Sequence, residues 1–110
     1  MLIAGFVLAG ENAKRLLVRA VGPGLSAQGV VDVLADPQLT IYRGADPIAT
    51  NDNWNSADQS VFKQVGAFDL TPASKDAAVV ADLVAGVYTV VVRGANNTIG
   101  TALVEIYEVP

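Results

Sequence analysis

The sequence contains no cysteine and no histidine. Without cysteine there are no disulfide bonds, no thiolate metal sites and no cysteine nucleophile. Without histidine the chain lacks the commonest general base and the usual ligand of zinc and iron. An enzyme made from the remaining residues would need a lysine base or paired carboxylates. No spacing singles out a pair among Asp32, Asp36, Asp46, Asp52, Asp58, Asp69, Asp76 and Asp82, so we expect a noncatalytic protein.

Charge is also scarce, because only 16% of the residues are charged and the net charge at pH 7 is -4. The basic residues are scattered along the chain: Lys14, Arg15, Arg19, Arg43, Lys63, Lys75 and Arg93. This distribution argues against a phosphate-binding surface, so we expect no nucleic-acid partner. The apolar stretch 1–10 lacks a basic flank and is far shorter than the roughly 20 residues that span a bilayer. We therefore expect a strand there and no membrane insertion.

The apolar residues, 52% of the chain, recur with a period of two in short runs that Gly, Asn, Asp and Pro separate. This pattern is typical of antiparallel strands. We predict strands at 2–9, 14–21, 38–43, 47–51, 76–83, 86–94 and 101–109. The fold predicted for residues 1–110 is a single all-β domain, an antiparallel β-sandwich of jelly-roll type with about seven strands and one short helix in a crossover. The last three strands are expected to form a meander.

Alternation within the strands predicts which side chains point inward. These are Leu16, Val18, Ala20, Leu39, Ile41, Tyr88, Val90, Val92, Ala102, Val104 and Ile106. Arg15 and Arg19 fall on the opposite face of their strand. Residues 25–37 are predicted to be a long connection with a helical turn at 30–35.

The helix is predicted at 56–66, where Ser56 can cap its start together with Gln59 three residues later. Asp58 favours the positive end of the helix, and Gly66 is suited to end it in a left-handed conformation. The apolar stripe of this helix consists of Ala57, Val61, Phe62 and Val65.

The stretch IATNDNWN, residues 48–55, holds the sole tryptophan and permits three interpretations. The first interpretation is a calcium site, because side-chain oxygens suit a hard cation. The predicted ligands are Asn51, Asp52, Asn53 and Asp58, which Asn55, Asp36 or Asp46 could join. Sugar stacking on Trp54, with Tyr42 as its companion, is the second. In the third, the polar side chains satisfy turn amides and Trp54 covers the end of the core. The fold itself requires no cofactor.

The first strand has no charged residue and no polar face, so both of its faces need cover. It is predicted either to run through the middle of the sandwich beneath the helix or to dock against another copy of the chain. The outer face of the last strands is also unusually apolar. The residues predicted to contact a subunit or neighbouring domain are Leu2, Phe6, Leu8, Val91, Leu103 and Tyr107.

Five blocks in this order resemble a module of large secreted and surface proteins of environmental bacteria, often C-terminal or in tandem. They are LIAGFVLAG, KRLLVRAVGPGL, LADPQLTIYRG, IATNDNW and LVAGVYTVVVRGANNTIGTALVEIYEV. The segment AGVYTVVVRG is also similar to the GxYxVxV strand of bacterial pre-peptidase C-terminal domains, which are jelly-roll modules. The resemblance implies a noncatalytic β-sandwich outside the cell or on its surface.

The expected function is that of a structural or interaction module, whose partners are identical subunits or neighbouring domains of the same protein. It would be a tandem repeat or a filament subunit. The alternative is a calcium-dependent carbohydrate-binding module centred on Trp54, for which a glycan would be the partner.

Overall fold

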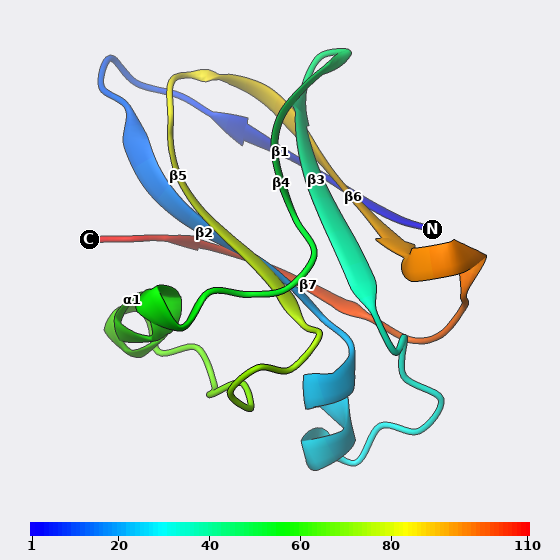
Figure 1. Cartoon of the computed structure of the whole chain (residues 1–110). Coiled ribbons are helices and arrows are strands. Elements are labelled where there is room, and N and C mark those ends of the chain that lie inside the picture. Colours follow the sequence, from blue (N-terminus) through cyan, green and yellow to red (C-terminus); the bar gives the residue numbers. More distant parts are fainter.

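Seven antiparallel strands form two sheets in the computed structural model, which describes residues 1–110 (Figure 1). The strands are β1 (Leu2–Leu8), β2 (Lys14–Val21), β3 (Pro37–Arg43), β4 (Asp46–Asn51), β5 (Ala77–Leu83), β6 (Gly86–Gly94) and β7 (Leu103–Glu108). One sheet has the order β1-β6-β3-β4 and the other the order β5-β2-β7. The predicted β-sandwich and its strands are confirmed.

Only the β3–β4 hairpin stays within one sheet, and every other connection carries the chain to the opposite sheet. The predicted meander of the last three strands is therefore wrong, because β6 lies in the four-stranded sheet while β5 and β7 flank β2 in the other. The reason lies in β2, whose residues from Leu16 to Val21 are all buried. A strand buried on both faces takes the centre of its sheet, and both β5 and β7 pair with it.

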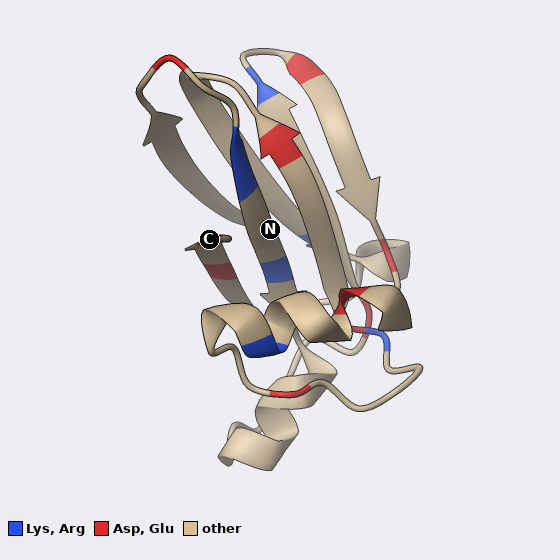
Figure 2. Ribbon diagram, turned by 90° about the vertical axis from the view of Figure 1, so that its left-hand side faces the viewer, with Lys and Arg blue, Asp and Glu red and all other residues tan.

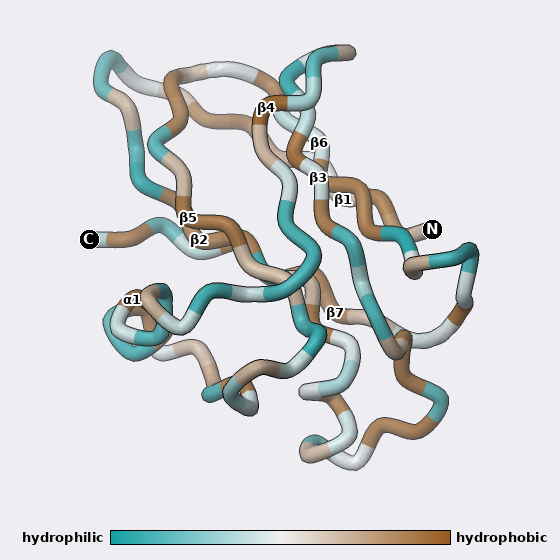
Figure 3. The backbone as a smooth tube through the Cα atoms, in the orientation of Figure 1, coloured by the Kyte–Doolittle hydropathy of each residue, from teal (hydrophilic) through white to brown (hydrophobic).

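The core between the sheets is made by the residues that alternation predicted. Those that are fully buried are Leu16, Val18, Ala20, Leu39, Ile41, Tyr88, Val90 and Val92. Burying each large side chain of this kind stabilises the fold by about 1.5–3 kcal/mol. The prediction holds less well for β7, where Val104 is half-buried and Ile106 is exposed, because β7 is an edge strand. In Figure 3 hydrophobic colour runs along much of β1, β2, β5 and β6, while the turns between β1 and β2 and between β3 and β4 are largely hydrophilic.

A second apolar layer lies on the outer face of the three-stranded sheet. The segment between β4 and β5 covers it with a 3-10 turn, η2 (Ser56–Asp58), and a helix, α1 (Gln59–Val65) (Figure 1). Its buried residues are Leu17, Val21, Leu25, Trp54, Phe62, Ala67, Leu70, Ala78 and Val109. The helix ends as predicted at Gly66, whose φ is 76°. No helix in the chain is both long enough and apolar enough to cross a membrane.

The predicted start of the helix was wrong in its detail. Asn55, not Ser56, makes the cap, since its Oδ1 accepts a hydrogen bond of 2.9 Å from the N–H of Ala57. The first turn is a 3-10 turn, which places the cap one residue earlier. Ala57, assigned to the apolar stripe, is exposed in this turn.

The helical turn predicted at 30–35 lies earlier, at η1 (Pro23–Gln28). The buried carboxylate of Asp76 fixes this corner, because its Oδ1 accepts hydrogen bonds of 2.8 Å from the Gly22 N–H and 3.1 Å from the Gly24 N–H. A Cβ on Gly22 would lie 2.0 Å from the carbonyl oxygen of Leu34, so only glycine fits there. The corner turns the chain after β2, and residues 30–35 pass it without becoming helical.

The helical layer is joined to the sheet by Arg19, whose side chain is fully buried on the outer face of β2. Its Nε donates to Glu105 Oε1 at 2.8 Å, and its Nη1 donates to the carbonyl oxygen of Phe68 at 2.7 Å. The guanidinium carbon lies 4.7 Å from the ring centres of both Phe62 and Phe68. Tyr107 donates its hydroxyl hydrogen to Glu105. The pKa of Tyr107 is raised, first by burial and then by the hydrogen bond to Glu105 and the negative charge of Glu105. Sequence alternation placed Arg19 on the correct face, but this face is buried.

We predict that Arg19→Ala lowers the free energy of unfolding by about 3–5 kcal/mol, because it leaves Glu105 as a largely buried charge without its partner. The measurement is urea unfolding followed by circular dichroism. Arg15→Ala is the matched control on the same face of the same strand: Arg15 pairs with Asp82 at 3.0 Å, and both side chains are about 60% exposed. Arg15→Ala should leave stability almost unchanged. Equal losses in the two variants would contradict the structural role of Arg19.

Candidate functional site

Trp54 is part of the second apolar layer and is only 7% exposed. Its ring lies against Phe62 with the ring centres 5.2 Å apart. The indole N–H donates to the Thr71 carbonyl oxygen at 3.3 Å and to Ser74 Oγ at 3.2 Å. These contacts agree with the third interpretation of residues 48–55, in which Trp54 covers part of the core. The ring offers no open face on which a sugar could stack.

Tyr42, the predicted companion of Trp54, lies elsewhere. It stands half-buried on the outer face of β3 in the four-stranded sheet, where it lines a hollow of about 150 Å³ together with Val91 and Arg93. Trp54 covers the outer face of the three-stranded sheet. The two aromatic rings therefore lie on opposite sides of the sandwich and form no common platform.

The four residues predicted to bind calcium have different surroundings. The side-chain oxygen of Asn51 accepts a hydrogen bond of 3.1 Å from the Ala78 N–H, which links β4 to β5. Asp58 is half-buried beside the start of α1, and this burial raises its pKa. Asn53 and Asp52 are exposed in the turn that follows β4. No three acidic side chains of the chain lie close enough together to hold a metal ion.

Two carboxyl groups do come together, those of Asp52 and Asp36. Desolvation raises the pKa of Asp52, and the hydrogen bond to Asp36 and the negative charge of Asp36 raise it further. The positive charge of Lys75 lowers it. Asp36 Oδ1 is buried and has no hydrogen-bond partner. Asp36 precedes β3 and Asp52 follows β4, so the antiparallel hairpin brings them to the same end. Calcium binding at this end of the hairpin stays a prediction.

The first strand pairs within its own chain. Residues Leu2 to Leu8 of β1 lie antiparallel to residues Val92 to Gly86 of β6. The expectation that this strand runs through the middle of the sandwich beneath the helix was wrong, because β1 is the edge of the four-stranded sheet and α1 covers the other sheet. One edge of β1 and one of its faces therefore have no cover.

The uncovered face carries the outward side chains of β1 and β6, which we call the β1–β6 surface: Ile3, Gly5, Val7, Val87, Thr89 and Val91. Val7 is 71% exposed, Val87 65% and Ile3 56%. None of these residues is charged. Figure 2 shows charged residues dispersed over the fold with no gathered patch of one sign. Contiguous exposed apolar residues of this kind mark interaction sites in soluble proteins.

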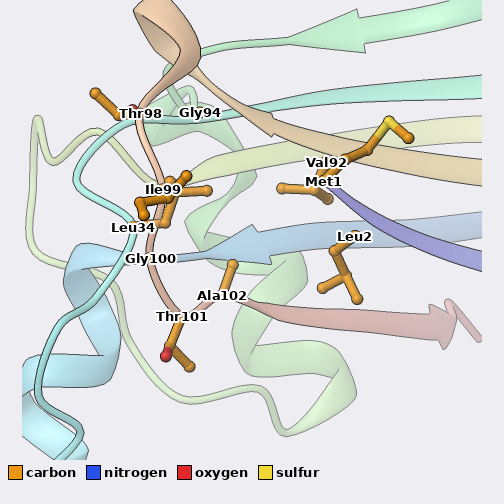
Figure 4. A pocket seen from close by; sticks show the side chains of 10 residues that line it. All are labelled: Met1, Leu2, Leu34, Val92, Gly94, Thr98, Ile99, Gly100, Thr101 and Ala102. Atoms are coloured by element: carbon orange, nitrogen blue, oxygen red, sulfur yellow. The ribbon is translucent and has the colours of Figure 1, made fainter.

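The inner core is incompletely covered where the edge strands β1 and β7 lie on the same side of the sandwich. We call this opening the seam; its side chains are Leu2, Phe6 and Leu8 of β1 and Val104 and Ile106 of β7, all half-buried or exposed. The opposite side is closed by the contact of β4 with β5. At one end the seam widens into a cavity of about 320 Å³. Figure 4 shows Leu2 projecting there from the start of β1 toward β7.

The six predicted contact residues fall into three groups. Leu2, Phe6 and Leu8 lie in the seam, and Phe6 also stacks on Tyr88 with the ring centres 5.2 Å apart. Val91 lies on the β1–β6 surface. Leu103 and Tyr107 belong to the other sheet, where Leu103 is exposed at the edge and Tyr107 packs in the layer under α1. The single outer face that was predicted to hold Val91, Leu103 and Tyr107 together does not exist.

Sequence reasoning missed the buried charged groups. Arg19 and Asp76 are both fully buried. One signal for Arg19 was its place in a strand with apolar residues of both parities, because such a strand needs cover on both faces. The pairing of Asp36 with Asp52 depends on the register of the β3–β4 hairpin, which fixes both positions at once. Alternation alone could not reveal it.

No protein family, no curated protein and no solved structure matches this chain. The arguments for its function therefore come from its own residues and geometry.

We predict that Asp52→Asn raises the melting temperature at pH 7 in the presence of a chelator. A carboxyl whose pKa is raised by folding favours the protonated form, so its ionisation costs stability once the pH exceeds the unfolded pKa of about 3.9. The gain should shrink as the pH falls through the raised folded-state pKa of Asp52, and it should be absent below about 3.9. Asp46→Asn, at an exposed position of the hairpin turn, is the control and should show no such trend.

The variant Asp52→Asn also tests calcium binding. If an ion binds between Asp36 and Asp52, calcium raises the melting temperature of the natural protein and this rise is lost in Asp52→Asn. A melting temperature that does not change with calcium or chelator would remove the calcium interpretation. A destabilised Asp52→Asn in chelator would contradict the unfavourable ionisation of Asp52.

Proposed function

We propose that this domain is a noncatalytic structural and interaction module of the cell exterior, which assembles with identical subunits or neighbouring domains. The observation that carries the proposal is the β1–β6 surface, an exposed apolar face without charge on a sheet that the chain itself leaves bare. It would serve in a tandem repeat or as the subunit of a filament.

The contrast between the two sheets supports this proposal. The three-stranded sheet has its outer face covered by α1 and the segments around it, and nine side chains are buried between the sheet and this layer. The four-stranded sheet has no such layer, although Ile3 and Val7 of β1 and Val87 of β6 are exposed on its outer face. An antiparallel sheet with one solvated face normally carries polar residues on that face, so an apolar outer face indicates a contact. A partner would provide this cover.

The positions of the chain ends and the sequence resemblance agree with a module in a series. The first and last residues lie at opposite ends of the sandwich in Figure 1, so neighbouring domains could follow one another in a line. The resemblance to tandem modules of secreted proteins implies the same arrangement and the same location. Burial of Trp54 removes the surface on which the carbohydrate alternative was centred.

The proposal predicts self-association that depends on the β1–β6 surface. In size-exclusion chromatography with light scattering, the apparent mass of the natural domain should rise with its concentration. Val7→Lys should weaken this association roughly tenfold or more, since a charge in an apolar contact costs at least about 1.4 kcal/mol. Val31→Lys is the control, because Val31 is a valine of similar exposure, 78%, in a loop outside this surface.

Circular dichroism first establishes that both variants are folded. A strictly monomeric natural domain at the highest attainable concentration would count against self-assembly. An equal loss of association in Val31→Lys would show that the β1–β6 surface is not the contact.

A further inference from the structure

We infer that two copies of this chain join through the free edges of β1, which pair antiparallel across a two-fold axis at Gly5. The two four-stranded sheets would then form one sheet of eight strands. This inference rests on the proposed function and deepens it, because it names the partner as a second copy and the contact as a main-chain strand pairing.

The edge of β1 lacks every feature that normally prevents such pairing. Edge strands are usually protected by charges, prolines, bulges or a covering loop. β4 has Pro47, Asp46 and a bulge at Ile41–Tyr42 in its pairing with β3, and its end is linked to β5. β5 carries Asp82 and is covered by that same link. β7 carries the exposed charge of Glu108.

In contrast, the seven residues of β1 contain no charge and no proline. The strand pairs with β6 residue by residue over its whole length, so no bulge bends its edge. The main-chain groups along this edge are available to another strand. Among the four edges of the sandwich, β1 is the one suited to pairing.

The alternation of β1 restricts the register. Opposite residues of an antiparallel pair lie on the same face, so a shared inner face requires paired residue numbers with an even sum. Pairing all seven residues of both strands fixes that sum at 10, which places Gly5 opposite Gly5 of the second copy. Ala4 then lies opposite Phe6, Leu2 opposite Leu8 and Ile3 opposite Val7, so that apolar side chains meet on both faces.

The same arrangement covers the seam. Leu2, Phe6 and Leu8 are half-buried or exposed because the three-stranded sheet ends at β7 and does not reach beneath β1. A two-fold axis perpendicular to the sheet keeps the inner faces of both copies on the same side. The exposed Ile106 of β7 in each copy then faces the seam of the two copies. The β1 and β7 strands of both copies, four strands in all, would share one core.

Charge favours a second copy in the antiparallel direction. The net charge of -4 makes two copies repel each other in general, but residues 2–8 bring no charge to the contact. Arg93 lies on β6 just beyond the residue paired with Leu2, and Glu11 follows the other end of β1. Antiparallel pairing brings each Arg93 toward Glu11 of the second copy, whereas parallel pairing would bring like charges together.

The absence of cysteine allows a direct test by a single engineered thiol. In the inferred register, the two copies of residue 5 have Cα atoms about 4.5–5.5 Å apart, within the range that a disulfide spans. A Cβ on Gly5 has room, because its nearest neighbour is the Tyr88 carbonyl oxygen at 3.7 Å. Gly5→Cys should therefore form a covalent dimer rapidly on mild oxidation, measured by nonreducing electrophoresis.

Ala9→Cys is the control, since Ala9 is also exposed and uncharged but lies opposite residue 1 of the second copy. The two copies of residue 9 are then eight residues apart along the strand, about 27 Å, and cannot be bridged. The crosslinking rate of Gly5→Cys should exceed that of Ala9→Cys at least tenfold. Urea should abolish the difference, because it depends on the folded pairing.

The outcomes separate this inference from the proposed function. Equal crosslinking of the two variants in a domain that self-associates by light scattering would overturn the β1 edge pairing and leave assembly through the outward side chains of the β1–β6 surface. A domain that stays monomeric and crosslinks at neither position would overturn both. Preferential crosslinking at Gly5 with a mass of two chains supports both.

Discussion

The buried ion pair between Arg19 and Glu105 is the interaction on which the arrangement of this fold depends. It allows β2, the central strand of its sheet, to carry a guanidinium on a face that the helix covers. The charge is compensated by one carboxylate, one backbone carbonyl and the faces of two phenylalanine rings, so burial becomes tolerable. The helical layer is thereby held to the three-stranded sheet.

An asymmetric sandwich follows from this interaction. The single α-helix covers the smaller sheet, and no element of the chain covers the outer face of the larger sheet. The uncovered face coincides with the strand that has no charge and with the edge that has no protection. These features converge on β1, which is why we propose that the function of the domain depends on this strand and not on the polar loop around Trp54.

The sequence predicted the strands well because their alternation is a local property. It also identified Gly66 as the end of the helix, since a left-handed residue at that point is a local requirement. It failed on the partners of the strands: β6 and β7 follow each other in the sequence but belong to different sheets. Such pairing is decided by which strand needs cover on both faces, and this depends on the whole fold.

The site was predictable to a similar extent. The apolar character of β1 could be read from its residues, and it is the reason that this strand was predicted to contact a partner. Its edge position and the seam beside β7 depend on sheet order and could not be read in this way. Trp54 and Tyr42 illustrate the opposite case, because their residue types suggested a common platform that the sandwich places on opposite sides.

The central claim is that the free edge of β1 pairs with a second copy of the chain. Hydrogen exchange of the backbone amides, measured by mass spectrometry over a range of protein concentrations, tests it most directly. The account predicts that amides of residues 2–8 become more protected as the concentration rises, while those of the β4 edge, residues 46–51, do not change. Protection of residues 2–8 that is independent of concentration in an associating sample would contradict it.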